Sequence, residues 1–324
     1  MKKIFPLLFL LLLTLAACSN NQNSADDQTL TVYTTVFPLT SFVEQIAEDT
    51  VNVESIYPQG ADMHSYEPTQ KDMISYSDGD LFLTTSNELD PVASSIAETI
   101  KNDTEIIETA ADINAEAFLE SHHEHGHEEA HSDEEEHDHG SMDPHIWLSP
   151  SLASDMALSV KTALTELSPD NADMYNENYE ALKADIEQLD EQLTQISSDP
   201  VNTDVFISHE SIGYLAHQYG FNQVGINGLS NQEPSQQELT EIIDSINAED
   251  IPYILYEPNV TSTVTDVIRS ETNAEPLYFN NLESLANNDP EDATYQSMME
   301  KNIESLDKAL NNNCLLYTSD AADE

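Results

Sequence analysis

The sequence predicts an α/β protein of two lobes, each a mostly parallel sheet flanked by helices, joined by one long rigid helix. Stretches rich in β-branched and aromatic residues alternate with stretches whose apolar residues recur at helical spacing. Strands separated by helices favour a parallel sheet covered on both faces. The alternation occurs twice, before residue 169 and after residue 199, and the segment between reads as a single helix.

The first residues read as an export signal. Lys2 and Lys3 precede an apolar run that is too short for a membrane-spanning helix, so residues 1–17 are predicted to be a signal peptide. The sequence LAAC at residues 15–18 resembles a bacterial lipobox, which implies cleavage before Cys18 and lipid attachment to it. We therefore expect an extracytoplasmic protein that is anchored to the outer face of the bacterial cell membrane through the polar tether 18–28.

The first region, residues 29–168, carries four predicted strands and four predicted helices. The strands are expected at residues 30–35, 51–57, 80–85 and 105–109. The helices are expected at residues 39–46, from residue 70, at 91–101 and at 152–167.

The segment 169–199 is predicted to be one helix that links the lobes. Its apolar residues follow one another at steps of four and three, which makes a continuous stripe opposite an acidic face. They are Leu182, Ile186, Leu189, Leu193 and Ile196. Pro200 ends the helix. A helix of this length is expected to act as a stiff strut, and the alternative is a core helix of a single domain.

The second region, residues 200–313, repeats the architecture of the first. Strands are expected at residues 204–208, 224–226, 251–258 and 276–279. Helices are expected at residues 212–219, 236–246, 264–271 and 294–310. Residues 314–324 look like one reading frame of a transposase adapter used for sequencing libraries, so we exclude them, and with them Cys314, from the prediction of the fold.

The net charge excludes one class of partner. The chain has 62 acidic and 9 basic residues, a formal net charge of −53. A nucleic acid would be repelled, because there are few lysines and arginines to neutralise its phosphates. Such a charge suits a secreted protein in a medium whose salt screens the repulsion.

A polar run at residues 121–140 contains most of the histidines. They are His122, His123, His125, His127, His131, His137 and His139. The run has almost no apolar residue to bury, so it is expected to form a mobile loop. Histidine-rich tracts are typical of metal binding, which suggests an auxiliary loop that collects metal ions. The alternative is a dispensable, solvated insertion.

Three isolated histidines, His64, His145 and His209, form the candidate metal site. His64 and His209 follow predicted strands, and ligands of open parallel sheets lie beyond the carboxyl ends of the strands. A lone histidine after a strand is more often structural, but three of them beside a histidine-rich run favour a zinc site. The fourth ligand is open among Glu257, Glu283 and water.

Three motifs in the mature chain carry a resemblance to a known family. They are MHSYEP at residues 63–68, DPHIWL at 143–148 and SHESIGYLA at 208–216. Together with the lipobox they resemble the zinc branch of the metal-binding lipoproteins of cluster A-I ABC importers, from about residue 30 to about residue 310. The resemblance implies two α/β lobes joined by one long helix, Zn²⁺ held between them, a membrane permease and its ATPase as partners, and no catalysed reaction.

The same resemblance implies a complete ligand set. The family ligands fall on His64, His145, His209 and Glu283, the last in FNNLES at residues 279–284. Manganese relatives place a carboxylate where this chain has His209, and three imidazoles favour zinc. Glu257 then becomes a residue of the lobe interface or one that orients a ligand imidazole. His217 is interpreted as a surface histidine.

Two other functions remain open. One is a manganese- or iron-binding member of the same importer class. The other is a secreted zinc hydrolase, against which there is no HExxH sequence, since no histidine follows Glu210 at the required spacing. We expect a monomer, and a role in cell adhesion, attributed to relatives, leaves no readable trace in the sequence.

Overall fold

A computed structural model describes residues 29–120, 142–259 and 263–311 of the chain. The predicted signal segment, Cys18 and its tether, the seven histidines of the run 121–140 and the excluded segment 314–324 lie outside these residues. Within the described part, no helix has both the length and the hydrophobicity that crossing a bilayer requires.

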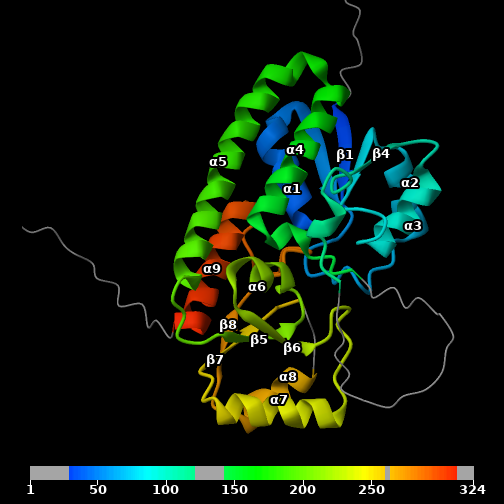
Figure 1. Cartoon of the computed structure of the whole chain (residues 1–324). Coiled ribbons are helices and arrows are strands. Elements are labelled where there is room, and N and C mark those ends of the chain that lie inside the picture. Colours follow the sequence, from blue (N-terminus) through cyan, green and yellow to red (C-terminus); the bar gives the residue numbers. More distant parts are fainter. Residues whose placement is uncertain (1–28, 121–141, 260–262, 312–324) are drawn as a thin grey trace, which may run out of the picture.

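The first sheet contains four parallel strands in the order β2-β1-β3-β4 (Figure 1). These are β1 Leu30–Thr34, β2 Val51–Ser55, β3 Leu81–Thr84 and β4 Glu105–Glu108. The helices are α1 Phe37–Ala47, α2 Gln70–Ser77, α3 Pro91–Ile100 and α4 Pro150–Leu167. Three of the four carry proline in their first turn, where a missing N–H costs nothing, and α2 begins with a capping box at Thr69.

The second sheet repeats this arrangement in the order β6-β5-β7-β8, again all parallel. Its strands are β5 Asp204–His209, β6 Asn222–Asn227, β7 Tyr253–Tyr256 and β8 Glu275–Tyr278. The helices of this region are α6 Gly213–Tyr219, α7 Gln236–Ala248, α8 Thr263–Glu271 and α9 Tyr295–Asn311. The predicted fold class is confirmed: two parallel sheets flanked by helices, with one long helix between them.

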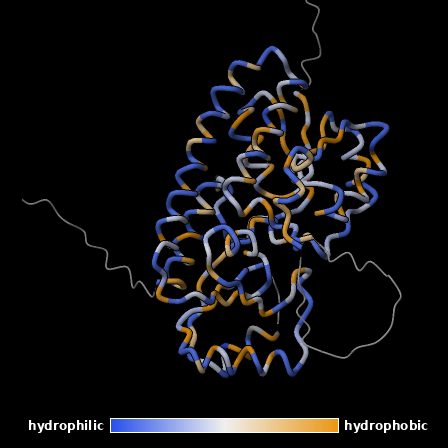
Figure 2. Tube along the Cα trace, in the orientation of Figure 1, coloured by the Kyte–Doolittle hydropathy of each residue, from blue (hydrophilic) through white to orange (hydrophobic). Residues whose placement is uncertain are grey.

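That long helix is α5, Ala172–Ser197, preceded by a 3₁₀ turn at Pro169–Asn171. Its 26 residues span about 39 Å. It packs against α1, α4, α6 and α9, and its apolar stripe is buried while its outer turns are predominantly hydrophilic (Figure 2). The helix is therefore both a connection between the two sheets and a core helix, so the two alternatives that the sequence left open are not exclusive.

One hydrophobic core runs through both regions. Val205 and Ile207 of β5 point into it, together with residues of α1, α4, α5 and α9. Phe206, between them, points to the opposite face of the sheet and into a smaller core under α7 and α8. The division into lobes 29–168 and 200–313 around a linking segment 169–199 stays a prediction.

Two of the differences from the sequence prediction lie next to the candidate site. Residues Ile146–Leu148 form a 3₁₀ turn that precedes α4 directly, and this turn was not predicted. Strand β5 continues through His209, so this histidine is the last residue of the strand instead of the first residue after it. Its backbone is therefore fixed by the sheet, since it pairs with Asn227 of β6.

Candidate metal centre

Four side chains from four separate segments meet between the two sheets. His64, His145, His209 and Glu283 each offer one ligand atom, and these atoms all lie within 4.8 Å of one another. His64 lies in the segment after β2, His145 between β4 and α4, His209 at the end of β5, and Glu283 after β8. His64, His145 and Glu283 come after strands and His209 is the last residue of one, so all four belong to the carboxyl ends of strands, where parallel sheets bind their ligands. The convergence thus comes from the topology of both sheets.

The distances suit a small cation. Glu283 Oε1 lies 3.4 Å from His145 Nε2 and 3.4 Å from His64 Nε2. Donors 2.0–2.1 Å from a zinc ion at tetrahedral angles are about 3.3 Å apart. The ring centroids of His145 and His209 are 4.9 Å apart, and those of His64 and His209 are 5.6 Å apart. The donor atoms can therefore surround one ion after small side-chain adjustments.

Three of the four residues are shielded from solvent. His145 and His209 are fully buried and Glu283 is 2% exposed, whereas the side chain of His64 is 16% exposed. A buried set of polar side chains that lacks enough hydrogen-bond partners is costly. In agreement with this, the buried His64 Nε2 lies 3.4 Å from Glu283 Oε1 but makes no hydrogen bond of good geometry. The opening to solvent is on the side of His64.

Glu283 is held by both halves of the chain. Its Oε2 accepts a hydrogen bond from the backbone N–H of Met63 at 3.2 Å, and its Oε1 accepts one from the Asn281 side-chain amide at 3.0 Å. The preceding residue, Leu282, has a φ of 63°, a left-handed conformation that is unfavourable for leucine. The hydrogen bond from Leu282 N–H to Asn280 Oδ1 (2.7 Å) stabilises this bend. Backbone strain at a site of this kind is typical of functional residues.

His145 is oriented by Asp143. The carboxylate oxygen Oδ1 of Asp143 lies 2.8 Å from His145 Nδ1 and accepts the backbone N–H of the same histidine at 2.9 Å. A carboxylate on Nδ1 places the proton there and leaves Nε2 for a metal ion. Nε2 is the nitrogen that faces Glu283.

Glu257 contacts the ring of His209. Glu257 Oε1 lies 3.2 Å from His209 Nδ1, and the Glu257 carboxylate also accepts hydrogen bonds from Ser208 and Ser211 at 2.7 and 2.6 Å. The other nitrogen, Nε2, lies 3.0 Å from the carbonyl oxygen of Leu229. These contacts fix the plane of the ring before any ion binds.

The electrostatics favour a cation. Burial alone would lower the pKa of His145, but Asp143 and Glu283 outweigh this effect and raise the pKa to about 10. Burial would raise the pKa of Glu283, but the imidazoles of His145 and His64 hold it well below its usual range. Burial is likewise outweighed at His209, whose pKa is raised mainly by Glu257. At neutral pH the centre therefore contains a carboxylate and protonated imidazole, and a metal ion would displace protons.

Sequence reasoning gave no role to two carboxylates at this centre, and it placed His217 outside the centre. Asp143 was part of a motif but had no role, although an aspartate two residues before a candidate ligand is a signal that could have been used. Asp90, fully buried and hydrogen-bonded to the hydroxyl of Tyr57 at 2.8 Å, adds a further carboxylate near His64. His217 is exposed on α6, which confirms its interpretation as a surface residue.

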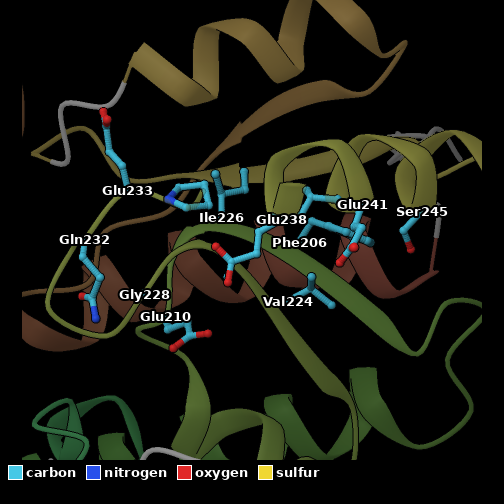
Figure 3. Close-up of a pocket in the computed structure, with 13 residues that line it drawn as sticks. Phe206, Glu210, Val224, Ile226, Gly228, Gln232, Glu233, Glu238, Glu241 and Ser245 are labelled. Atoms are coloured by element: carbon cyan, nitrogen blue, oxygen red, sulfur yellow. The ribbon is translucent and has the colours of Figure 1, made fainter. Parts of the chain in front are cut away.

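The groove in Figure 3 is a different feature. It encloses about 510 Å³ between β5, β6 and α7, with Phe206, Val224 and Ile226 on its floor and glutamates at its rim. None of the four clustered residues lines it. Glu210 belongs to this groove although it follows His209 directly.

Comparison with known proteins agrees with the geometry. The chain is 32% identical over 313 residues to the zinc-binding lipoprotein AdcA of Streptococcus pneumoniae strain R6, covering 94% of this chain and 60% of that protein's length. It is 31% identical to the high-affinity zinc uptake system protein ZnuA of Bacillus subtilis, covering 92% of this chain and 94% of that protein.

A solved structure shows the same fold. The Zn(II)-bound ZnuA-like domain of Streptococcus pneumoniae AdcA superposes with a TM-score of 0.71 at 27% identity, covering 87% of this chain and 99% of that domain. Residues 32–309 match the sequence family described as "Zinc-uptake complex component A periplasmic". The chain therefore belongs to this family, the ZnuA family.

Proposed function

We propose that this protein is the zinc-binding component of an ABC importer. It captures Zn²⁺ outside the cell, between its two sheets, and delivers the ion to a membrane permease that is driven by an ATPase. The protein itself catalyses no reaction. The family match supports this proposal, as do the zinc-binding names of the relatives described above.

The observation that carries the proposal is the cluster of four donor atoms. His64, His145, His209 and Glu283 are brought within 4.8 Å by segments far apart in the chain. Imidazole nitrogens suit zinc, whereas manganese prefers carboxylate and carbonyl oxygens. Three nitrogens and one oxygen therefore favour zinc over manganese, and Glu283 takes the fourth position in this proposal in preference to water.

The location of the protein is proposed from the sequence and the relatives. A lipid on Cys18 anchors the protein to the outer face of the cell membrane, and residues 18–28 are its tether. One relative, AdcA, is described as a lipoprotein. We propose that the anchored protein acts as a monomer.

Metal binding by matched variants tests the proposal. Zinc affinity is measured by competition with a chromophoric chelator for the parent protein, His145→Ala, His209→Ala and the control His217→Ala. The first two variants lose a ligand and are expected to bind zinc more than about 100-fold more weakly, since even indirect changes at metal sites cost 10–100-fold. His217→Ala removes an exposed histidine and is expected to bind like the parent.

Two further measurements separate the alternatives. A chain in which residues 121–141 are replaced by a short turn is expected to keep one tight zinc site, and loss of all binding in that chain would mean that the ligand assignment is wrong. Competition among zinc, manganese and iron(II) identifies the cargo, and preference for manganese would favour the other branch of importers. Turnover of ester or peptide substrates by the zinc-loaded protein would instead support the hydrolase.

A further inference from the structure

The residues on either side of the segment 121–141 form a short antiparallel pair, the stem, which consists of Leu119 and Glu120 on one side and Met142 and Asp143 on the other. Glu120 and Met142 form an isolated antiparallel bridge. One residue further out from the segment, the backbone N–H of Asp143 donates to the carbonyl oxygen of Leu119 at 2.9 Å. His145 follows Asp143 by two residues, so the stem ends next to a residue of the metal centre.

The hydroxyl of Tyr214 completes this stem. In a hydrogen-bonded antiparallel pair, the two residues exchange both N–H···O bonds. Here only one is direct: the second pair of groups, Leu119 N–H and Asp143 C=O, is bridged by Tyr214. Its hydroxyl accepts from Leu119 N–H at 3.2 Å and donates to the Asp143 carbonyl oxygen at 2.9 Å. Tyr214 is 4% exposed and belongs to α6, which lies after the long helix α5.

The same helix also lies close to the side-chain carboxylate of Asp143. A Cβ atom on Gly213 would lie 2.6 Å from Asp143 Oδ2, so only glycine lets the helix approach the carboxylate this closely. That carboxylate contacts His145 Nδ1 at 2.8 Å. Tyr214 therefore holds Asp143 by its backbone carbonyl, Gly213 leaves the space that the Asp143 carboxylate occupies, and this carboxylate contacts His145.

We infer that Tyr214 is a positioning residue: its hydroxyl closes the stem of the segment 121–141 and fixes Asp143, so that His145 keeps its orientation whatever happens within that segment. This inference rests on the proposed zinc site. Along the chain, residues 142–144 connect the segment to His145. The two hydrogen bonds of the Tyr214 hydroxyl restrain this connection at Asp143 and its partner Leu119.

A double-mutant cycle tests the inference. Tyr214→Phe removes only the hydroxyl, and it is made both in the full chain and in a chain in which an Asn-Gly turn replaces residues 122–140. Leu119 and Asp143 are a hydrogen-bonded position, so Glu120 and Met142 are not, and the next hydrogen-bonded position would be that of residues 121 and 141. A two-residue turn between residues 121 and 141 therefore suits the register of the stem. Tyr219→Phe is the matched control, since it also removes one hydroxyl from α6, where it donates to Asp190 at 2.6 Å.

In the full chain, Tyr214→Phe is expected to weaken zinc binding about tenfold, the lower range for residues that orient a ligand. In the shortened chain the turn holds the stem covalently, so the loss is expected to fall below about threefold. The absorption bands of bound Co²⁺, which report the arrangement of the ligands, are expected to change in the full-length Tyr214→Phe variant only. Tyr219→Phe is expected to change neither quantity in either chain.

Gly213→Ala is expected to weaken binding equally in both chains, because it acts on the Asp143 carboxylate directly. An equal loss for Tyr214→Phe in both chains would mean that Tyr214 merely supports the fold, and no loss in the full chain would remove its positioning role; either result overturns the inference. Amide hydrogen exchange at Leu119, whose N–H donates to the Tyr214 hydroxyl, can be measured in the absence of zinc. If the parent protein bound no zinc, the proposed function would fail. Faster exchange at Leu119 in Tyr214→Phe would still support the role of Tyr214 in closing the stem. Unchanged exchange would refute that role.

Discussion

At the centre, two of the three imidazoles have a buried carboxylate next to their Nδ1 atom. Asp143 serves His145, and Glu257 serves His209. His64 differs: its ring pairs with Glu283 itself at 3.4 Å, and Asp62 accepts only its backbone N–H. Carboxylates behind ligand histidines raise their basicity and fix their orientation. The two buried histidines are thus prearranged, whereas His64 is the partly exposed ligand at the opening.

The raised pKa of His145 predicts how the metal-free protein responds to pH. The folded-state pKa is about 10, above the ordinary value of 6.5, so the protonated form stabilises the fold. This contribution is fully present below about pH 6.5 and is lost as the pH rises toward 10. The unfolding midpoint in urea, measured in the presence of a chelator, is therefore expected to fall between pH 7 and pH 9. His209, whose pKa is also raised, acts in the same direction.

His145→Gln is the control for this prediction. Glutamine keeps a polar side chain but does not titrate, so the variant is expected to show a flatter pH dependence. A parent protein whose stability rises over this pH range would contradict the electrostatic picture of the centre.

At the scale of elements, α5 shows how a sequence pattern becomes a packed surface. The predicted stripe Leu182, Ile186, Leu189 and Leu193 is buried, and Tyr175 and Tyr179 extend it toward the start of the helix. The stripe faces α1 and α4 at one end and α9 at the other. One helix therefore contributes to the packing of both sheets.

Shortening one buried side chain of this stripe is expected to destabilise the whole protein. Leu189 is 1% exposed, and Leu189→Ala leaves a cavity that is expected to lower the free energy of unfolding by about 2–5 kcal/mol. The measurement is urea unfolding followed by circular dichroism. Gln192→Ala, on the exposed side of α5, is the control and is expected to change stability by less than about 0.5 kcal/mol. A single cooperative transition is expected, because both halves share one core; two separate transitions would contradict that view.

At the scale of the whole molecule, the two halves are tied by more than α5. Helix α9 crosses back to pack on α1 and α5. The Trp147 indole N–H donates to the Asn281 carbonyl at 2.7 Å, and the Tyr295 hydroxyl donates to the Trp147 carbonyl at 2.8 Å. Both bonds are buried and lie close to the metal centre. Wide opening about a hinge would break these bonds and expose a continuous core.

We therefore expect only small rearrangements when zinc binds. Spin labels at exposed Lys101 and Gln236, in a chain whose Cys18 and Cys314 are replaced by serine, report the separation of the two halves. The mean distance between the labels is expected to change by less than about 2 Å between the chelator-treated and the zinc-loaded protein. A change many times larger would show that the halves move as separate bodies.

The sequence by itself determined the secondary structure and the identity of the candidate donors. Apolar periodicity and turn residues are local signals, so the strands and helices were predicted within a few residues of their ends. The isolated histidines could be identified as candidate ligands from the sequence, because few histidines lie outside the run 121–140. The choice of Glu283 over Glu257 and water came from resemblance to a family, since one glutamate among so many acidic residues carries no local signal. The 3₁₀ turn at Ile146–Leu148 was missed because its conformation is imposed by packing around Trp147.

Only the tertiary structure decided which of these residues meet. The 4.8 Å cluster, the carboxylate of Glu257 behind His209 and the hydroxyl of Tyr214 in the stem join segments separated by tens of residues or more. The single core shared by both halves also consists of contacts between residues far apart in the sequence. Such contacts depend on how two sheets are placed against each other, and that placement is determined by the packing of α5 and α9, which no short stretch of sequence contains.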